Sequence, residues 1–294
     1  MSVMEQSQRS AAAEPPQQPE LRKGLPAWLR HKSFLVGLGM VAVVILVALV
    51  SRVYTPYSPN TMTIAERHLP PSTLHWLGTD EYGRDLLSRI MVGSRAALYV
   101  GTVSTLLAAG LGVLLGAVAG YYGGPVGEVI MRFIDGLYAF PAILLAIMVI
   151  SVLGPGLVNT TLAIGVGGIP VFARLTRAEL LALRERDFVE AARALGVRDA
   201  RILWRHIMPN ALGPILVQMS ISFATAVLAE AGLSYLGLGT QPPDPSWGRM
   251  LKESQSFMLR APWTAVAPGV AILLTVMGFN LLGDGLRDLL DPTD

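Results

Sequence analysis

The stretch that decides the fold is Arg186–Asn210, which reads RDFVEAARALGVRDARILWRHIMPN. This segment, called the island below, is charged, favours helix and lies between two long apolar segments. A membrane protein keeps its hydrophobic runs in lipid and its arginines in water. The island is therefore expected to protrude from the bilayer, where a soluble partner can contact it. The simpler alternative is an ordinary solvated loop helix.

The island predicts two short helices joined by a turn. Phe188–Leu195 contains no Gly or Pro and is rich in Ala, Leu, Glu and Arg, which favour helix. Gly196 suits the left-handed conformation that ends many helices. Asp199 is expected to cap the second helix by accepting from its free N–H groups. Pro209, which has no N–H to donate, is expected to end that helix.

Composition favours the membrane class. The 294 residues are 52% hydrophobic and 15% charged, whereas a soluble domain is about a quarter charged. A net charge of +2 without a basic cluster argues against nucleic acid as a partner. With no Cys, the chain has neither disulfides nor thiol chemistry.

Residues for catalysis, cofactors or metals are not recognisable in the chain. The apolar runs hold no nucleophile–base pair, and G-x-x-x-x-G-K-[ST] does not occur. We therefore assign no catalytic, cofactor-binding or metal-binding residue and do not expect an enzyme. The histidines have no metal-binding spacing and are expected at the surface: His31, His68, His75 and His206.

Apolar runs of about 20 residues predict six transmembrane helices. The expected spans are Phe34–Val53, Ala96–Gly120, Met131–Leu153, Leu157–Ala173, Leu212–Leu236 and Trp263–Leu282. Residues 1–32 are polar and Pro-rich and are expected to form a disordered tail. The transmembrane domain is expected to occupy residues 33–294, with the island inside a loop of about 174–211.

Basic residues predict the orientation. Eight arginines lie within the loop at 174–211, and five more basic residues precede the first apolar run. Cytoplasmic loops carry this excess. The island and both termini are therefore expected on the cytoplasmic side of a multi-pass membrane protein.

Glu230 is a carboxylate inside an apolar run, where a charge normally faces a cavity or a partner. We expect it to face a translocation pathway or to pair with a basic group. One functional class to consider is a secondary carrier that works alone. Such a carrier would need more ionisable residues within its helices than this chain has.

Two segments are expected on the outer side. Arg84–Met91 has an amphipathic pattern that predicts a short helix on the membrane surface. The second segment, LGLGTQPPDPSWGRML at 236–251, is rich in Pro and contains Trp247, which suits the water interface.

Several motifs resemble those of one transport family. In the island, Glu190-Ala191-Ala192, Gly196 and Pro209 are similar to the E-A-A…G…P signature of membrane subunits of bacterial ATP-binding-cassette importers. The island departs from the common pattern at His206 and Met208. The stretches 77–89, 140–141, 236–248 and 280–292 resemble the dipeptide and oligopeptide importer permeases, in particular the "C" subunit of the dipeptide and glutathione systems.

The resemblance implies an all-α type I importer permease fold with six transmembrane helices and a cytoplasmic coupling helix, located in the bacterial inner membrane. The coupling residues would be Glu190, Ala191, Ala192, Arg193, Leu195, Gly196 and Pro209. The outer residues Asp80, Arg84, Asp85 and Trp247 would receive a binding protein.

The implied partners are a second, homologous permease subunit, two cytoplasmic ATP-binding subunits that hold ATP and Mg, an extracytoplasmic binding protein and membrane lipid. The implied cargo is a small peptide, with glutathione or nickel as alternatives.

Overall fold

The computed structural model describes residues 32–290, so the expected tail lies outside the described residues except for Lys32. The longer helices are α2 (Lys32–Val50), α3 (Leu86–Tyr122), α4 (Gly124–Tyr138), α5 (Ala142–Leu153), α6 (Leu157–Arg184), α9 (Met208–Tyr235) and α11 (Trp263–Leu290). The short ones are η2 (Ile64–Glu66), α7 (Asp187–Ala194), α8 (Asp199–Arg201), η3 (Ile202–Ile207), α10 (Trp247–Ser254) and η4 (Gln255–Phe257).

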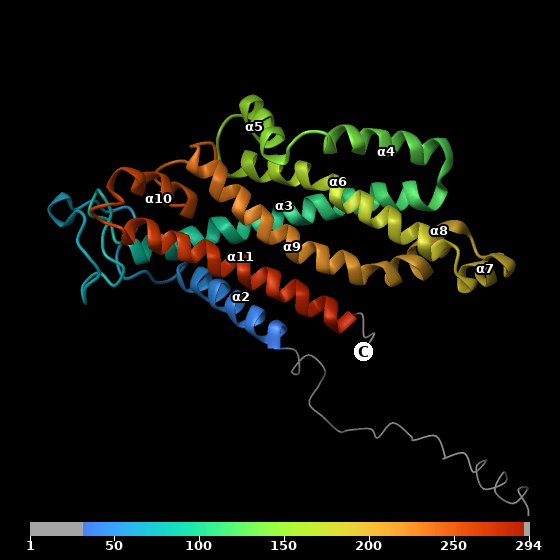
Figure 1. Ribbon diagram of the computed structural model, residues 1–294, viewed down its shortest axis with the longest axis horizontal. Coiled ribbons are helices and arrows are strands. Elements are labelled where there is room, and N and C mark those ends of the chain that lie inside the picture. Colours follow the sequence, from blue (N-terminus) through green and yellow to red (C-terminus); the bar gives the residue numbers. More distant parts are fainter. Residues whose placement is uncertain (1–31, 291–294) are drawn as a thin grey trace, which may run out of the picture.

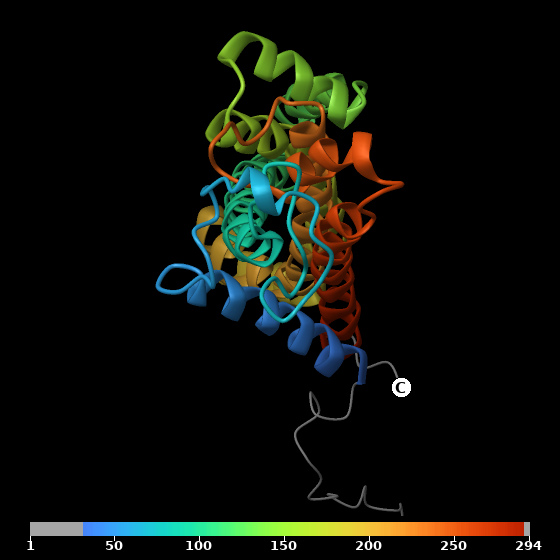
Figure 2. The same cartoon turned by 90° about the vertical axis from the view of Figure 1, so that its left-hand side faces the viewer.

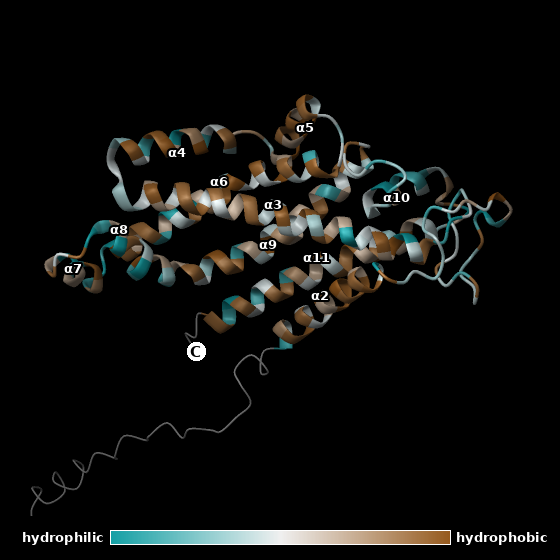
Figure 3. Cartoon of the chain, turned by 180° about the vertical axis from the view of Figure 1, so that it is seen from behind, coloured by the Kyte–Doolittle hydropathy of each residue, from teal (hydrophilic) through white to brown (hydrophobic). Residues whose placement is uncertain are grey.

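The long helices form an elongated bundle, with α3, α6, α9 and α11 running roughly along its length (Figure 1). The island lies at one end, and the loop 51–85 lies with α10 at the opposite end. Seen end-on, α2 and the pair α4–α5 lie on opposite sides of the bundle (Figure 2). Hydrophobic residues dominate the long helices, whereas hydrophilic residues are frequent at the two ends (Figure 3).

Within residues 32–290, five helices are long and apolar enough to cross a membrane, and a sixth crossing requires the pair α4–α5 to count as one. The third predicted span, Met131–Leu153, is divided between α4 and α5, which are bent by 88° relative to each other. Pro141 precedes the first residue of α5. Because it has no N–H, it cannot continue the hydrogen-bond ladder of α4.

Several helices are longer than their apolar runs. α3 begins at Leu86 instead of near Ala96, and α6 continues to Arg184 instead of ending near Ala173. Hydropathy marks only the part of a helix that faces lipid, whereas backbone hydrogen bonding continues through polar turns. The loop expected at 174–211 is therefore largely helical.

A glycine seam holds α3 against α6. A Cβ added at Gly112 would lie 2.6 Å from Cβ of Phe172, and one at Gly120 would lie 3.0 Å from the carbonyl oxygen of Arg177. At Gly116 it would collide with the carbonyl oxygen of Ala173. Small residues allow such close approach of helices in a membrane, so α3 and α6 are expected to move as one body.

Candidate functional site

The first helix of the island, α7, ends as the sequence predicts. Gly196 has a φ of +74°, in the left-handed region. Its N–H donates to the carbonyl of Arg193 at 2.9 Å, and the N–H of Val197 donates to that of Ala192 at 3.1 Å. This pair of bonds is the Schellman arrangement, which satisfies the free carbonyls of a helix end. The turn between the two arms of the island is thus fixed by backbone hydrogen bonds.

The second arm differs from its prediction in two respects. Asp199 is not a capping residue: Arg198 precedes the helix, and the Asp199 carboxylate accepts from the hydroxyl of Tyr121 at 2.6 Å. Pro209 does not end the helix, which continues through the π-helical η3 into α9. Pro209 lies in the first turn of α9, where a missing N–H is tolerated.

The island has an apolar inner face and an exposed outer face. The inner face packs on the ends of α3 and α6 through Val189, Ala192, Ile202, Leu203 and Ile207. On the outer face, Leu195 is 83% exposed, Trp204 49% and Phe188 40%. Of the predicted coupling residues, Ala192 is buried and the others are exposed. Large exposed apolar side chains among charges are typical of a docking surface.

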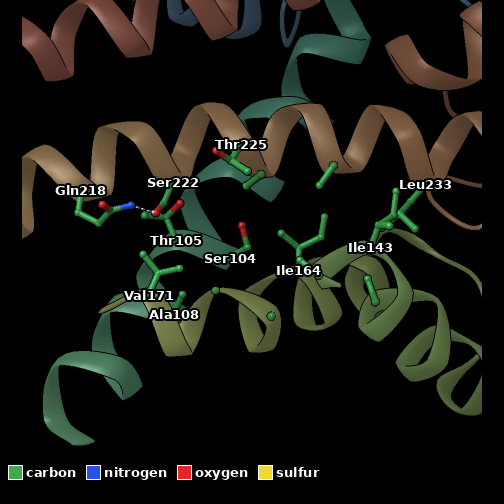
Figure 4. A pocket seen from close by; sticks show the side chains of 16 residues that line it. Ser104, Thr105, Ala108, Ile143, Ile164, Val171, Gln218, Ser222, Thr225 and Leu233 are labelled. Atoms are coloured by element: carbon green, nitrogen blue, oxygen red, sulfur yellow. Dashed lines mark hydrogen bonds between the residues drawn. The ribbon is translucent and has the colours of Figure 1, made fainter. Parts of the chain in front are cut away.

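A cavity of about 190 Å³ lies between α3, α5, α6 and α9. Its polar lining consists of Ser104 and Thr105 from α3 and Gln218, Ser222 and Thr225 from α9 (Figure 4). Nε2 of Gln218 donates to Oγ of Ser222 at 3.1 Å. Among the described residues, the lining contains hydroxyl, amide and apolar groups but no charged side chain.

Glu230 lies outside this lining, although its neighbours Ala229 and Leu233 belong to it. Its side chain is 2% exposed, and its Oε1 accepts from the hydroxyls of Ser234 at 2.6 Å and Thr240 at 3.5 Å. Glu230 thus connects α9 to the turn that precedes α10. Its role in a pathway stays a prediction.

At the opposite end, two of the predicted docking residues belong to a buried ion-pair cluster. Nε of Arg84 lies 2.6 Å from Oδ2 of Asp80, and its Nη2 lies 2.9 Å from Oε2 of Glu253. Arg89 contacts the same two carboxylates at 3.5 and 3.2 Å. The ion-pair cluster, Asp80, Arg84, Arg89 and Glu253, therefore joins the loop 51–85 and α3 to α10.

The other two predicted docking residues are buried as well. Asp85 is 3% exposed; its carboxylate accepts from the N–H of Ser88 at 2.8 Å and lies 2.9 Å from Nδ1 of His75. Nε1 of Trp247 donates to the carbonyl of Ile90 at 3.1 Å. The short surface helix predicted at Arg84–Met91 is wrong, because Leu86 begins the long helix α3 and the polar positions Ser88 and Arg89 are buried. His75, expected at the surface, is 5% exposed.

The docking role of these four residues stays a prediction. In this conformation the side chains of Asp80, Arg84, Asp85 and Trp247 contact other parts of the chain and present little area to a partner.

Glu81 lies beside the ion-pair cluster, and its environment disfavours the charged form. Burial, followed by the carboxylates of Glu253 and Asp80, raises the pKa of Glu81 from 4.5 to about 7, and nearby Arg84 opposes the shift. The folded protein therefore holds this proton more tightly than the unfolded chain between about pH 4.5 and 7. Stability from this group is complete below pH 4.5 and is lost as pH rises through 7.

We expect Glu81→Gln to match the wild type near pH 4.5 and to be more stable above pH 7. The gain should be about 1 kcal/mol, because partial exposure screens the full effect. Thermal unfolding of both proteins in detergent across pH 4–8 measures it. A difference that does not change with pH would contradict the assignment.

Two features escaped the sequence reasoning. Tyr121 ends an apolar run, and nothing local marks its contact with Asp199, 78 residues later. The polar lining of the cavity comes from isolated Ser, Thr and Gln residues in apolar helices. Their spacing carries a signal for α9, because Gln218, Ser222 and Thr225 recur every three or four residues on one helical face.

These features define a class of protein: a polytopic helical membrane protein with a cavity between its helices and, at one end, a charged helical island with exposed apolar side chains. Residues 112–293 match the family model described as binding-protein-dependent transport system inner membrane component. Residues 27–71 match the N-terminal transmembrane domain of oligopeptide transport permease C. The chain belongs to this family of inner-membrane transport permeases.

Two relatives are similar in sequence to this chain over most of its length. The dipeptide transport system permease protein DppC of Alkalihalophilus pseudofirmus is 45% identical over 263 residues, covering 90% of this chain and 86% of the relative. The glutathione transport system permease protein GsiD of Pectobacterium atrosepticum is 44% identical over 264 residues, covering 90% and 87%.

Among solved structures, an inward-facing form of the MetNI methionine ABC transporter superposes with a TM-score of 0.58 at 18% identity. The match covers 69% of this chain and 96% of that chain. It supports the fold, which is that of an importer permease.

Proposed function

We propose that this chain is the membrane subunit through which an ATP-driven importer passes small peptides. The observation that carries the proposal is the cavity between α3, α5, α6 and α9, because the island packs against the ends of two of these helices, α3 and α6. Its hydroxyl and amide groups can donate to and accept from peptide bonds, as orienting groups in ligand sites do. The similarity to a dipeptide permease supports the cargo class.

The importer needs partners that this chain does not contain. A second homologous permease subunit would complete the pathway, and one of two ATP-binding subunits would dock on Phe188, Leu195 and Trp204 of the island. ATP and Mg would be held by those subunits, because the sequence has no phosphate-binding G-x-x-x-x-G-K-[ST] motif. An extracytoplasmic binding protein would deliver peptide to the opposite end, as the family description supports.

The orientation follows from charge and from the described chain ends. The start of α2 and the end of α11 both point towards the island side of the bundle (Figure 1). The arginines of the island favour the cytoplasm. Both termini and the island would thus face the cytoplasm, where ATP is available. This chain would act without an enzymatic step of its own.

The proposal is tested by peptide uptake and ATP hydrolysis in vesicles that contain the complete importer. We expect dipeptides delivered by the binding protein to stimulate hydrolysis, with glutathione and nickel as the competing cargo in parallel assays. Stimulation by nickel alone would contradict the peptide assignment. Uptake that continues without the ATP-binding subunits would indicate the rival secondary carrier.

A matched pair of variants tests the turn of the island. Because Gly196 has a φ of +74°, Gly196→Val is strained, whereas Gly196→Asn adopts this conformation more readily. We expect Gly196→Val to lower peptide uptake about tenfold and Gly196→Asn to retain most of it, with equal membrane insertion. Equal uptake by the two variants would show that the turn is not needed for coupling.

A further inference from the structure

Tyr121 lies where the island meets α3. Its side chain is 5% exposed, and its hydroxyl donates to Oδ1 of Asp199 at 2.6 Å. The guanidinium of Arg193 also interacts with this hydroxyl. Arg193 belongs to α7 and Asp199 to α8, so the end of α3 contacts both arms of the island, one on each side of the Gly196 turn.

The same helix reaches the cavity. α3 is continuous over 37 residues from Leu86 to Tyr122. Ser104, Thr105 and Ala108 on α3 line the cavity. At a rise of 1.5 Å per residue, Thr105 is about 24 Å from Tyr121 along the helix axis. A displacement applied at Tyr121 therefore reaches the cavity wall through one unbroken helix.

α6 shares this junction. Nη1 of Arg184, the last residue of α6, donates to the backbone carbonyl of Tyr121 at 3.2 Å. Further along, the glycine seam packs α3 closely against α6. The end of α3 is thus held by hydrogen bonds to the island and to α6 at one residue.

We propose that Tyr121 is a positioning residue that transmits displacement of the island to α3, and through it to the wall of the cavity. The hydroxyl supplies the directional contact, and the aromatic ring supplies packing in the apolar cluster with Leu180, Val189 and Ile202. This inference rests on the function proposed above and names the residue through which the docked ATPase acts on the pathway.

Tyr121→Phe separates the two contributions, because it removes the hydroxyl and keeps the ring. Tyr122→Phe is the matched control: Tyr122 is 55% exposed, and its hydroxyl makes no hydrogen bond within residues 32–290. Asp199→Ala removes the same hydrogen bond from the other side. The double variant Tyr121→Phe/Asp199→Ala should lose little more uptake than either single variant, because both changes remove the same hydrogen bond.

Two measurements on the assembled complex decide the matter. The first is peptide taken up per ATP hydrolysed, which should fall about five- to tenfold in Tyr121→Phe and stay unchanged in Tyr122→Phe. The second is amide hydrogen exchange of residues 187–201, which should be faster in Tyr121→Phe because the island is less firmly held.

An unchanged uptake ratio in Tyr121→Phe would overturn the inference. So would a loss of uptake fully explained by reduced assembly, because the role would then be structural. Absence of peptide uptake by the wild type would reject the proposed function instead. Hydrogen exchange needs no cargo, so unchanged exchange in Tyr121→Phe would still reject the contact as the attachment of the island.

Discussion

Gly116→Leu is expected to prevent α3 and α6 from packing and to destabilise the protein by about 3 kcal/mol or more, at the upper end of overpacking effects. A side chain at this position collides with the backbone carbonyl of Ala173 on α6, which cannot rotate away as a flexible side chain could. Thermal unfolding in detergent, followed by the fraction that elutes as a single species, measures the loss.

Gly110→Leu is the control for this substitution. Gly110 lies on the same helix, is exposed, and would have no atom within 4 Å of an added Cβ. The two variants add the same side chain to the same helix, so their hydrophobicity and helix propensity match. Equal unfolding temperatures would contradict the packing of α3 against α6.

Arg89→Ala is expected to cost about 2–3 kcal/mol, because it removes one of the two arginines that contact both Asp80 and Glu253 and leaves the two carboxylates to share Arg84. Arg89 is 1% exposed and contacts both Asp80 and Glu253. The loss should loosen α10 from the loop 51–85. Faster proteolysis of that loop and a lower unfolding temperature are the measurable consequences.

Arg260→Ala provides the comparison, because Arg260 is an exposed arginine on the same side of the bundle. A surface change of this kind normally stays within about 0.5 kcal/mol. If both variants unfold alike, the ion-pair cluster does not hold this end together.

The sequence predicts well what depends on composition and local backbone chemistry. Apolar length locates the spanning helices, because every turn of a helix that crosses the membrane must suit the hydrocarbon core. Gly196 is also predictable, since the left-handed conformation that ends α7 follows from the residue type.

Contacts between distant segments are where sequence reasoning fails. Arg84 and Asp85 have the pattern of a surface helix, yet Glu253 and His75 provide buried partners that no local pattern reveals. Asp199 has the chemistry of a helix cap, but its carboxylate accepts a hydrogen bond from the hydroxyl of Tyr121 instead. The bend before Pro141 exceeds an ordinary proline kink, because the chain there begins a separate helix at 88°.

The most direct test of the account is labelling of a single cysteine at Leu195, which is 83% exposed at the tip of the island. The natural chain has no Cys, so it contributes no background. We predict that Leu195→Cys reacts with a membrane-impermeant maleimide only in inside-out vesicles, and that bound ATP-binding subunits protect it. Labelling from the outer face, or equal labelling with and without those subunits, would contradict the island as the site where an ATPase acts.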